Sequence, residues 1–260
     1  MTYTDPHDDV RAHRDWLLSF VDLPAGGTVV DLGCGTGGDL LALAGRHPSP
    51  ECRFLGIDAA ESGIAAASAR GAGDPRVAFL RHHLSGPVPL ADGSVDAVYS
   101  HNLLECLADP GAFAREAARI LRPGGATVVA HWDFDSQLFD GTDRAVVRRL
   151  VHAFADWRQP WMEHAEGWMG RRLHGVFART GLFDGTVHAR VLINTTYAAP
   201  WYGHARAQDI GRMVRKGLVS APDYDRFARD LEALDREGRY FYSITGFAYV
   251  GRRLSAFRSP

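Results

Sequence analysis

The sequence is poor in cysteine, in lysine and in long apolar runs. Its three cysteines lack metal-ligand spacing, so neither a disulfide framework nor a zinc site is expected. The arginines are scattered among acids and the formal net charge is -2, which excludes the basic surface that nucleic-acid binding requires. No apolar run could span a bilayer, and the polar, acidic N-terminus resembles no signal peptide. We therefore expect a cytoplasmic protein without a nucleic-acid or membrane partner.

What the sequence does contain is typical of a packed α/β protein. Hydrophobic residues make up 46% and charged residues 23% of the 260 residues, a length that suits one domain with an appended lid. Predicted strands cover 28–32, 53–57, 76–80 and 95–100, and predicted helices cover 39–46, 61–70 and 110–121. Because strands and helices alternate, we expect a parallel sheet.

The sequence also predicts the elements that precede and follow this core. Asp8 or Asp9 is predicted to cap an N-terminal helix with apolar positions at Val10, Leu17, Leu18 and Val21. RPGG, 122–125, is predicted to turn the last core helix into a strand over 126–132, and the polar HWDFD segment then emerges at the edge of the sheet. Beyond it we expect helices within 142–180 and 203–237 and strands at 186–197 and 240–250.

A glycine-rich loop joins the first predicted strand to its helix. DLGCGTGG, 31–38, contains G-x-G-x-x-G, a pattern that dinucleotide-binding proteins also show. Glycines allow a tight turn and a close approach of the backbone to a nucleoside. Asp31 suits the cationic amino group of a methionine moiety and would repel a pyrophosphate, and Asp58 is placed to accept hydrogen bonds from both ribose hydroxyls. The loop therefore favours S-adenosylmethionine over NAD.

Several motifs occur in the order that one family shows. VVDLGCGTGGDLLALA, GID, DGSVDAVYSHNLLECL and ILRPGG resemble the successive motifs of the class I S-adenosylmethionine-dependent methyltransferases. The resemblance implies an α/β, Rossmann-like fold with a seven-stranded, mostly parallel sheet, helices on both faces, an N-terminal helix and helical lid insertions. It also implies a single domain over 1–260, composed of a cap helix (1–27), a cofactor-binding core (28–132) and acceptor-binding insertions with the final strands (133–260).

The resemblance also implies which residues bind the cofactor. The methionine part is expected to meet Asp31, Gly33, Cys34, Gly35 and Gly37. Asp58 is expected at the ribose and Ala59 near the adenine. The acid that often meets the adenine amine is replaced here by Leu84, so adenine would rest on backbone groups or on His83. At the end of the fourth strand, the residues expected to face the methionine part and the acceptor are Ser100, His101 and Asn102.

The sequence gives weaker signals for the residues that bind the methyl acceptor than for those that bind the cofactor. Methyl transfer from a sulfonium needs no metal, so the protein has to align the reactants, exclude water and, for a hydroxyl or protonated amine, remove a proton. By position, the candidate bases are His101, His131 and Asp133. The candidate acceptor-binding aromatics are Tyr3, Trp132, Trp161, Trp168, Trp201 and Tyr202. Each candidate also has a purely structural interpretation. A histidine can be a hydrogen-bonded loop residue, an acid can cap the following helix, and an aromatic ring can belong to the small core of an insertion.

We therefore expect methylation of a small-molecule acceptor, with S-adenosylhomocysteine as the second product. Nitrogen is slightly favoured over oxygen, because HWDFD combines aromatic faces with carboxylates that suit a cationic nitrogen. The alternatives are an NAD-dependent oxidoreductase and a catalytically inactive, methyltransferase-like binding module. SHNLLE stands where DNA and RNA amino-group enzymes of the family show an N/D-P-P-Y/F motif, which argues against nucleic-acid acceptors. The sequence does not distinguish a monomer from a homodimer.

Overall fold

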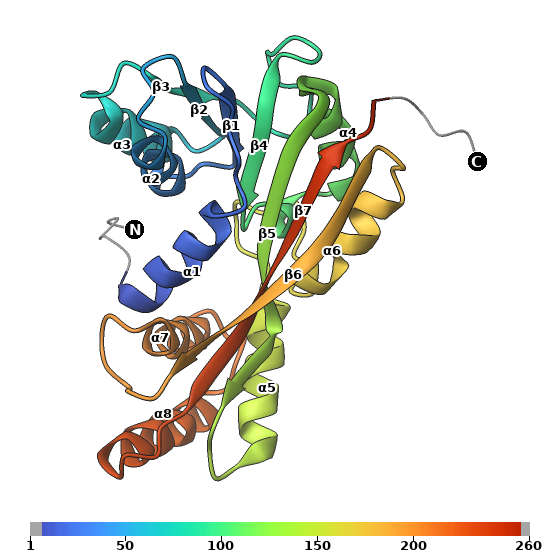
Figure 1. Ribbon diagram of the computed structural model, residues 1–260. Helices are drawn as coiled ribbons and strands as arrows, with labels where there is room; N and C mark the ends of the chain where they lie inside the picture. Colours follow the sequence, from blue (N-terminus) through green and yellow to red (C-terminus); the bar gives the residue numbers. More distant parts are fainter. Residues whose placement is uncertain (1–6, 256–260) are drawn as a thin grey trace.

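The chain is organised around a seven-stranded sheet in the order β3-β2-β1-β4-β5-β7-β6 (Figure 1). This computed structural model describes residues 7–255. β7 runs antiparallel to β5 and β6, and the other neighbouring strands are parallel, which confirms the mostly parallel sheet. The strands are β1 (Thr28–Leu32), β2 (Arg53–Asp58), β3 (Val77–Arg81), β4 (Val95–His101), β5 (Leu121–Phe139), β6 (Phe183–Asn194) and β7 (Tyr242–Arg253).

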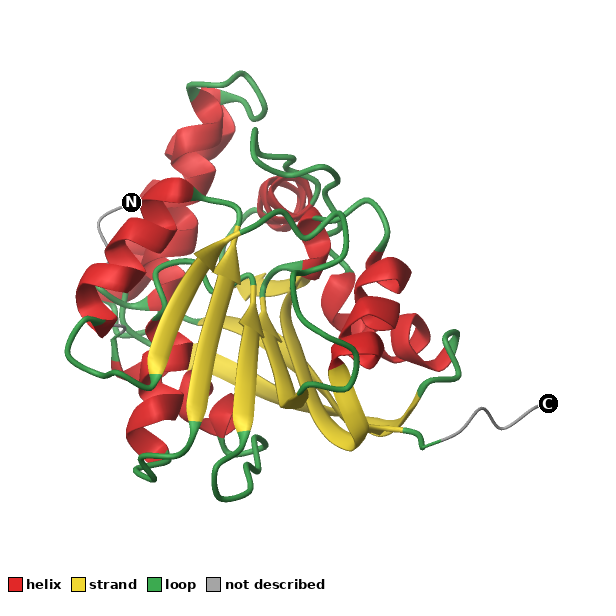
Figure 2. Cartoon of the chain, turned by 90° about the horizontal axis from the view of Figure 1, so that it is seen from above, coloured by secondary structure: helices red, strands yellow, loops and turns green. Residues whose placement is uncertain are grey.

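Helices cover both faces of this sheet, as predicted (Figure 2). α1 and α2 share an apolar cluster with one face, and α4 and α6 share another with the opposite face. α3 contacts β2 and β3 at one edge. The helices are α1 (Asp8–Leu18), α2 (Gly38–Arg46), α3 (Glu61–Gly71), the short η1 (Leu104–Cys106), α4 (Pro110–Ile120), α5 (Arg144–Ala155), α6 (Met169–Ala178), α7 (Tyr202–Val214) and α8 (Ala221–Arg236).

The far halves of β5, β6 and β7 extend beyond the core and carry α5, α7 and α8, seen in the lower part of Figure 1. A third apolar cluster joins Phe139 and Tyr242 of the strands to Leu150, Ile210 and Phe227 of the three helices. This extension corresponds to the helical insertions predicted after the core.

Helix boundaries in the core follow local signals. Asp109 caps α4 by accepting a hydrogen bond from the Ala112 amide at 2.9 Å, and Pro110 occupies the first turn, as predicted. At α1 the prediction was wrong in detail, because the residue before the helix is His7 and both Asp8 and Asp9 lie in the first turn. Acids there still suit the positive end of the helix dipole.

The prediction for β5 was wrong at both ends. The strand begins at Leu121, and RPGG forms an irregularity within it, where the pairing with β4 shifts register. At the other end the strand continues to Phe139 and not to Trp132, because β7 pairs along it from Ala126 onward. The strand therefore runs through the whole HWDFD segment. Among residues 7–255, no helix has the length and apolar character to cross a bilayer.

Candidate active site

The glycine loop turns sharply between β1 and α2. Gly35 has a φ of +53°, a left-handed conformation that favours glycine, and no atom lies within 4 Å of the position a Cβ would take. The backbone at Gly35 is therefore open to a ligand. Gly37 differs, since its Cβ would lie 2.7 Å from the ring of Phe79, so its small size serves packing.

Asp58 fixes this loop. Its Oδ2 accepts a hydrogen bond from the Gly35 amide at 2.8 Å, and its Oδ1 accepts one from the Ala60 amide at the same distance. A carboxylate has about four lone-pair sites, so each oxygen keeps capacity for a further donor. Asp58 also lines a cavity of about 560 Å³, the Asp58 cavity, together with Ala59, His83 and Leu84.

Asp31 is buried at the end of β1, and its Oδ1 has no hydrogen-bond partner within the described chain. Burial, and then the negative charges of Asp39 and Asp58, raise the pKa of Asp31 well above its ordinary value. The side chain lines a second cavity of about 400 Å³, the glycine-loop cavity. A buried carboxyl without a donor is costly, so this cavity fits a cationic group that donates to Asp31.

His101 is paired with Asp39. Asp39 Oδ2 lies 3.1 Å from His101 Nδ1 and accepts a hydrogen bond from the Tyr99 hydroxyl at 2.8 Å. Burial opposes ionisation of Asp39, but the hydrogen bonds from His101 and Tyr99 hold its pKa below the ordinary value. The resulting carboxylate favours the His101 tautomer with a proton on Nδ1 and a lone pair on Nε2. Nε2 is buried and unpartnered among residues 7–255.

A third and larger space, the aromatic cavity, has a volume of about 820 Å³. Its lining includes the buried Trp132, the half-buried Tyr202 and Trp161, which is 68% exposed. Asn102 lines all three cavities, and His101 lines both the glycine-loop and the aromatic cavity. The three cavities therefore meet around the end of β4, which the sequence predicted as the meeting point of cofactor and acceptor.

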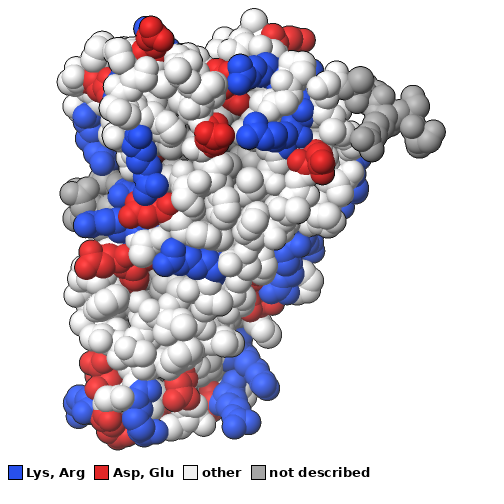
Figure 3. Space-filling view, in the orientation of Figure 1, with Lys and Arg blue, Asp and Glu red and all other residues white. Residues whose placement is uncertain are grey.

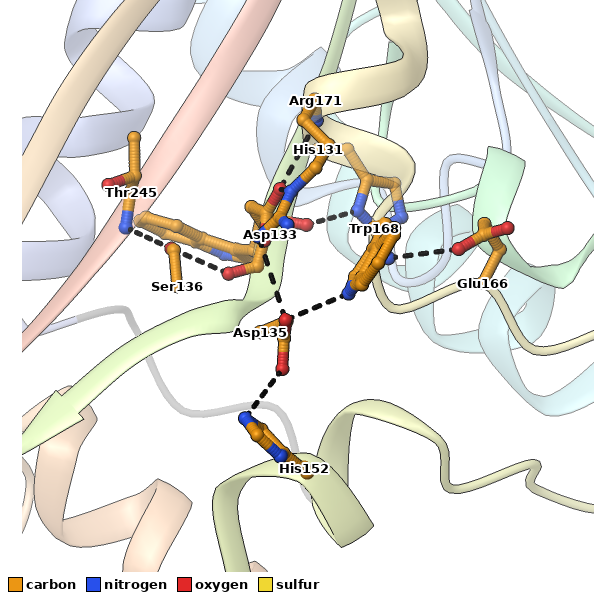
Figure 4. A network of polar contacts seen from close by, with 10 residues as sticks. His131, Asp133, Asp135, Ser136, His152, Glu166, Trp168, Arg171 and Thr245 are labelled. Atoms are coloured by element: carbon orange, nitrogen blue, oxygen red, sulfur yellow. Dashed lines mark hydrogen bonds and ion pairs between the residues drawn. The ribbon is translucent and has the colours of Figure 1, made fainter. Parts of the chain in front are cut away.

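Two predicted bases lie outside the lining of these cavities. His131 is buried, its Nδ1 lies 2.7 Å from the Trp132 carbonyl oxygen, and burial lowers its pKa to about 3. Asp133 is also buried and accepts two hydrogen bonds from the Arg171 guanidinium, at 2.5 and 2.6 Å (Figure 4). Of the three candidates, His101 therefore has the best position for proton transfer.

Other predicted site residues also have structural contacts. Ser100 is buried and donates to the Leu32 carbonyl at 2.7 Å, which ties β4 to β1. The Trp168 indole donates to Asp135 at 2.9 Å, outside the aromatic cavity (Figure 4). Trp201 packs edge-on against His7 with ring centroids 4.1 Å apart. Tyr3 lies outside the described residues.

Several site residues were missed in the sequence, among them Asp39, which lines the glycine-loop cavity and holds His101. Arg14 lines the glycine-loop cavity, and Glu105 and Arg206 line the aromatic cavity. Arg14 stands one helical turn after Val10, which lines the same cavity, so their spacing shows that the two share a face. Nothing in the sequence shows that this face covers the glycine loop. Arg206 has no local signal, because its position depends on how the extension packs, and Glu105 lies in the short η1 after β4, where nothing local marks it as a cavity residue.

Glu105 gives the protein a pH-dependent stability. Burial raises its pKa to about 8, an effect that the attraction of Arg206 does not offset. A carboxyl whose pKa rises on folding stabilises the fold fully below its ordinary pKa, and this contribution is lost as the pH rises. The free energy of unfolding should therefore fall between about pH 5 and about pH 8, by at most about 1.4 kcal/mol per pH unit.

Glu105→Gln should remove that slope, because glutamine cannot ionise. Denaturant unfolding of both proteins across this pH range measures the difference. A slope that is the same in the two proteins would contradict the burial argument.

Comparison with known proteins agrees with this geometry. Residues 30–129 match a family described as a methyltransferase domain. A 37.1 kDa protein encoded in transposon TN4556 of Streptomyces fradiae is 35% identical over 149 residues, 57% of this chain and 43% of the relative. A trans-aconitate 2-methyltransferase from Azoarcus sp. is 36% identical over 119 residues, 46% of this chain and 44% of the relative. The chain thus spans less than half the length of these two curated relatives.

A solved structure shows the same fold over nearly the whole chain. The YcgJ protein from Bacillus subtilis superimposes with a TM-score of 0.63 at 17% identity, covering 95% of this chain and all of that one. The strand order, the glycine loop and its two carboxylates define an α/β protein with cavities at the carboxyl edge of its sheet, where ligands of such folds bind. With the matched domain over residues 30–129, they make the chain similar to the class I S-adenosylmethionine-dependent methyltransferases, whose methyl donor is S-adenosylmethionine.

Proposed function

We propose that this protein transfers a methyl group from S-adenosylmethionine to a small-molecule acceptor held in the aromatic cavity. One observation carries the proposal: His101 and Asn102 line both the glycine-loop cavity and the aromatic cavity. Two ligands in these cavities would therefore meet at the end of β4. The Azoarcus relative is named for methylation of a small molecule, trans-aconitate, which supports an acceptor of this size.

The residues present fit the donor. The unpartnered Oδ1 of Asp31 would accept a hydrogen bond from the methionine ammonium, and Arg14, with a buried and unpartnered Nε among the described residues, would bind its carboxylate. Asp58 would accept hydrogen bonds from the ribose hydroxyls. The adenine would lie in the Asp58 cavity beside Ala59, His83 and Leu84. The donor supplies an electrophilic methyl group, and the protein supplies alignment.

His101 would act as the general base. Asp39 holds the imidazole by Nδ1, which leaves the lone pair of Nε2 available to take a proton from a hydroxyl or an ammonium group. The buried ring of Trp132 and the half-buried ring of Tyr202 would help to keep water from the transfer. A base of this kind suits nitrogen and oxygen acceptors alike.

The preference for nitrogen rested on the acids of HWDFD. In the structure Asp133 is bound by Arg171, while Asp135 contacts Trp168 and His152 (Figure 4). Neither acid lines the aromatic cavity, so they do not favour a cationic nitrogen there. The proposal therefore includes both acceptor atoms.

Methyl-labelled S-adenosylmethionine tests this function. The protein is incubated with the labelled donor and a cell extract, and a labelled small molecule should appear that mass spectrometry can identify. Calorimetry with S-adenosylhomocysteine and with NAD runs in parallel. Binding of NAD alone would favour the oxidoreductase, and weak or absent binding of both without a labelled product would favour the inactive module.

A further inference from the structure

Arg206 of α7 lines the aromatic cavity with an unused hydrogen-bond donor. Its side chain is only 19% exposed, and its Nη2 lies 2.7 Å from Asp209 Oδ2. Its Nε is buried and has no partner in the part of the chain that the structure describes. The guanidinium lies 4.6 Å from the ring centroid of Tyr202, which holds it over an aromatic face. A desolvated guanidinium with a spare donor is costly unless a ligand satisfies it.

The cavity as a whole is positively charged. Besides Arg206, its lining includes Arg212, Arg215 and Lys216, all from the end of α7 or just beyond it. For Arg215 and Lys216, no described carboxylate lies within ion-pair distance, whereas Asp209 is shared between Arg206 and Arg212. The other lining acid is Glu105, and a carboxyl with a pKa of about 8 is mostly protonated near neutral pH. Cations thus outnumber ionised acids, and this charge repels a cationic ligand.

We propose that the methyl acceptor carries an anionic group, a carboxylate or a phosphate, which binds Arg206, and an apolar body that packs against Trp132, Tyr202 and Trp161. This inference rests on the proposed function, since it assigns the acceptor of that reaction. Arg206 presents a planar set of donors that matches the oxygens of a carboxylate or phosphate. A volume of about 820 Å³ suits a ligand with a ring or short chain between the anion and the reacting atom.

Matched probes that differ in charge test the inference. Cinnamate and cinnamamide share shape and apolar area, and phenyl phosphate supplies the alternative anion. Calorimetry at neutral pH measures their binding to the protein saturated with S-adenosylhomocysteine. Cinnamate or phenyl phosphate should bind roughly tenfold more tightly than cinnamamide, and the stronger of the two identifies the preferred anion.

Variants at Arg206 locate the binding. Arg206→Gln should weaken anion binding roughly tenfold to a hundredfold while cinnamamide binding stays constant, because glutamine lacks the charge. Arg206→Lys should retain part of the anion preference. Arg149→Gln removes an exposed arginine that pairs with Asp223 away from the cavity, and it should change nothing. Circular dichroism checks the fold of each variant.

Two results would overturn the inference. One is equal affinity of the wild-type protein for the anions and the amide, including no binding of any probe at millimolar concentration. The other is undiminished anion binding by folded Arg206→Gln. Affinity for S-adenosylhomocysteine is measured separately in every variant. If the wild-type protein does not bind S-adenosylhomocysteine, the proposed function fails. The anionic-acceptor inference is judged separately, from the relative affinities for the anions and the amide.

Discussion

Asp58→Ala should weaken the affinity for S-adenosylhomocysteine by at least about 100-fold, because it removes an acceptor for two ribose hydroxyls and each such bond to a carboxylate contributes about 1.5–3 kcal/mol. The variant also frees the Gly35 amide, which Asp58 Oδ2 holds at 2.8 Å. The lost ribose hydrogen bonds and the freed Gly35 amide both weaken the binding of S-adenosylhomocysteine. Titration calorimetry of wild-type and variant proteins gives the ratio of dissociation constants.

Asp22→Ala is the matched control. Its carboxylate is 88% exposed and lies 3.9 Å from Arg252, away from the three cavities, so cofactor affinity should not change. The thermal midpoint of unfolding shows whether Asp58→Ala is folded. If the folded variant binds as tightly as the wild-type protein, the assignment of the Asp58 cavity to the nucleoside fails.

His101→Ala should lower kcat for the acceptor found by methyl labelling by about 100- to 10,000-fold, the range typical of a lost general base. Affinity for S-adenosylhomocysteine should change much less, because Asp31 and Asp58 remain in place. Single-turnover kinetics with labelled donor measure the chemical step, and calorimetry measures the binding.

His152→Ala serves as the control for this experiment. His152 is an exposed histidine of α5 that contacts Asp135 and does not line the aromatic cavity. Its variant should turn over at the wild-type rate. A wild-type rate for His101→Ala would show that proton removal is not needed or that another group performs it, and the role given to His101 would be wrong.

The core was predictable because its signals are local. Residues 28–32 form β1 as predicted, and α4 begins where Asp109 and Pro110 place it. The end of β5 was not predictable, because the strand conformation of residues 131–139 depends on pairing with β7, more than a hundred residues further along the chain. Local composition cannot show that partner.

The same limit applies to the candidate site. The glycine loop, Asp31 and Asp58 are adjacent to strand ends, so topology alone brings them together. Among the aromatic residues, Trp132, Trp161 and Tyr202 line a cavity, whereas Trp168 and Trp201 pack elsewhere. Composition identifies aromatic residues but not the direction in which each ring points. That direction is decided by the packing of α5, α6 and α7.

The length of β5 has a consequence for engineering. One continuous strand runs from the pairing with β4 to the cluster that holds α5, α7 and α8. The helices α5, α7 and α8 are thus attached to the same strand that pairs with β4 in the core (Figure 1), and on the face shown in Figure 3 acidic and basic side chains are interspersed. A chimera that exchanges only residues 140–155 and 202–236, which carry α5, α7 and α8, would keep β5, α6 and β6 and so leave the sheet and its covering helices intact.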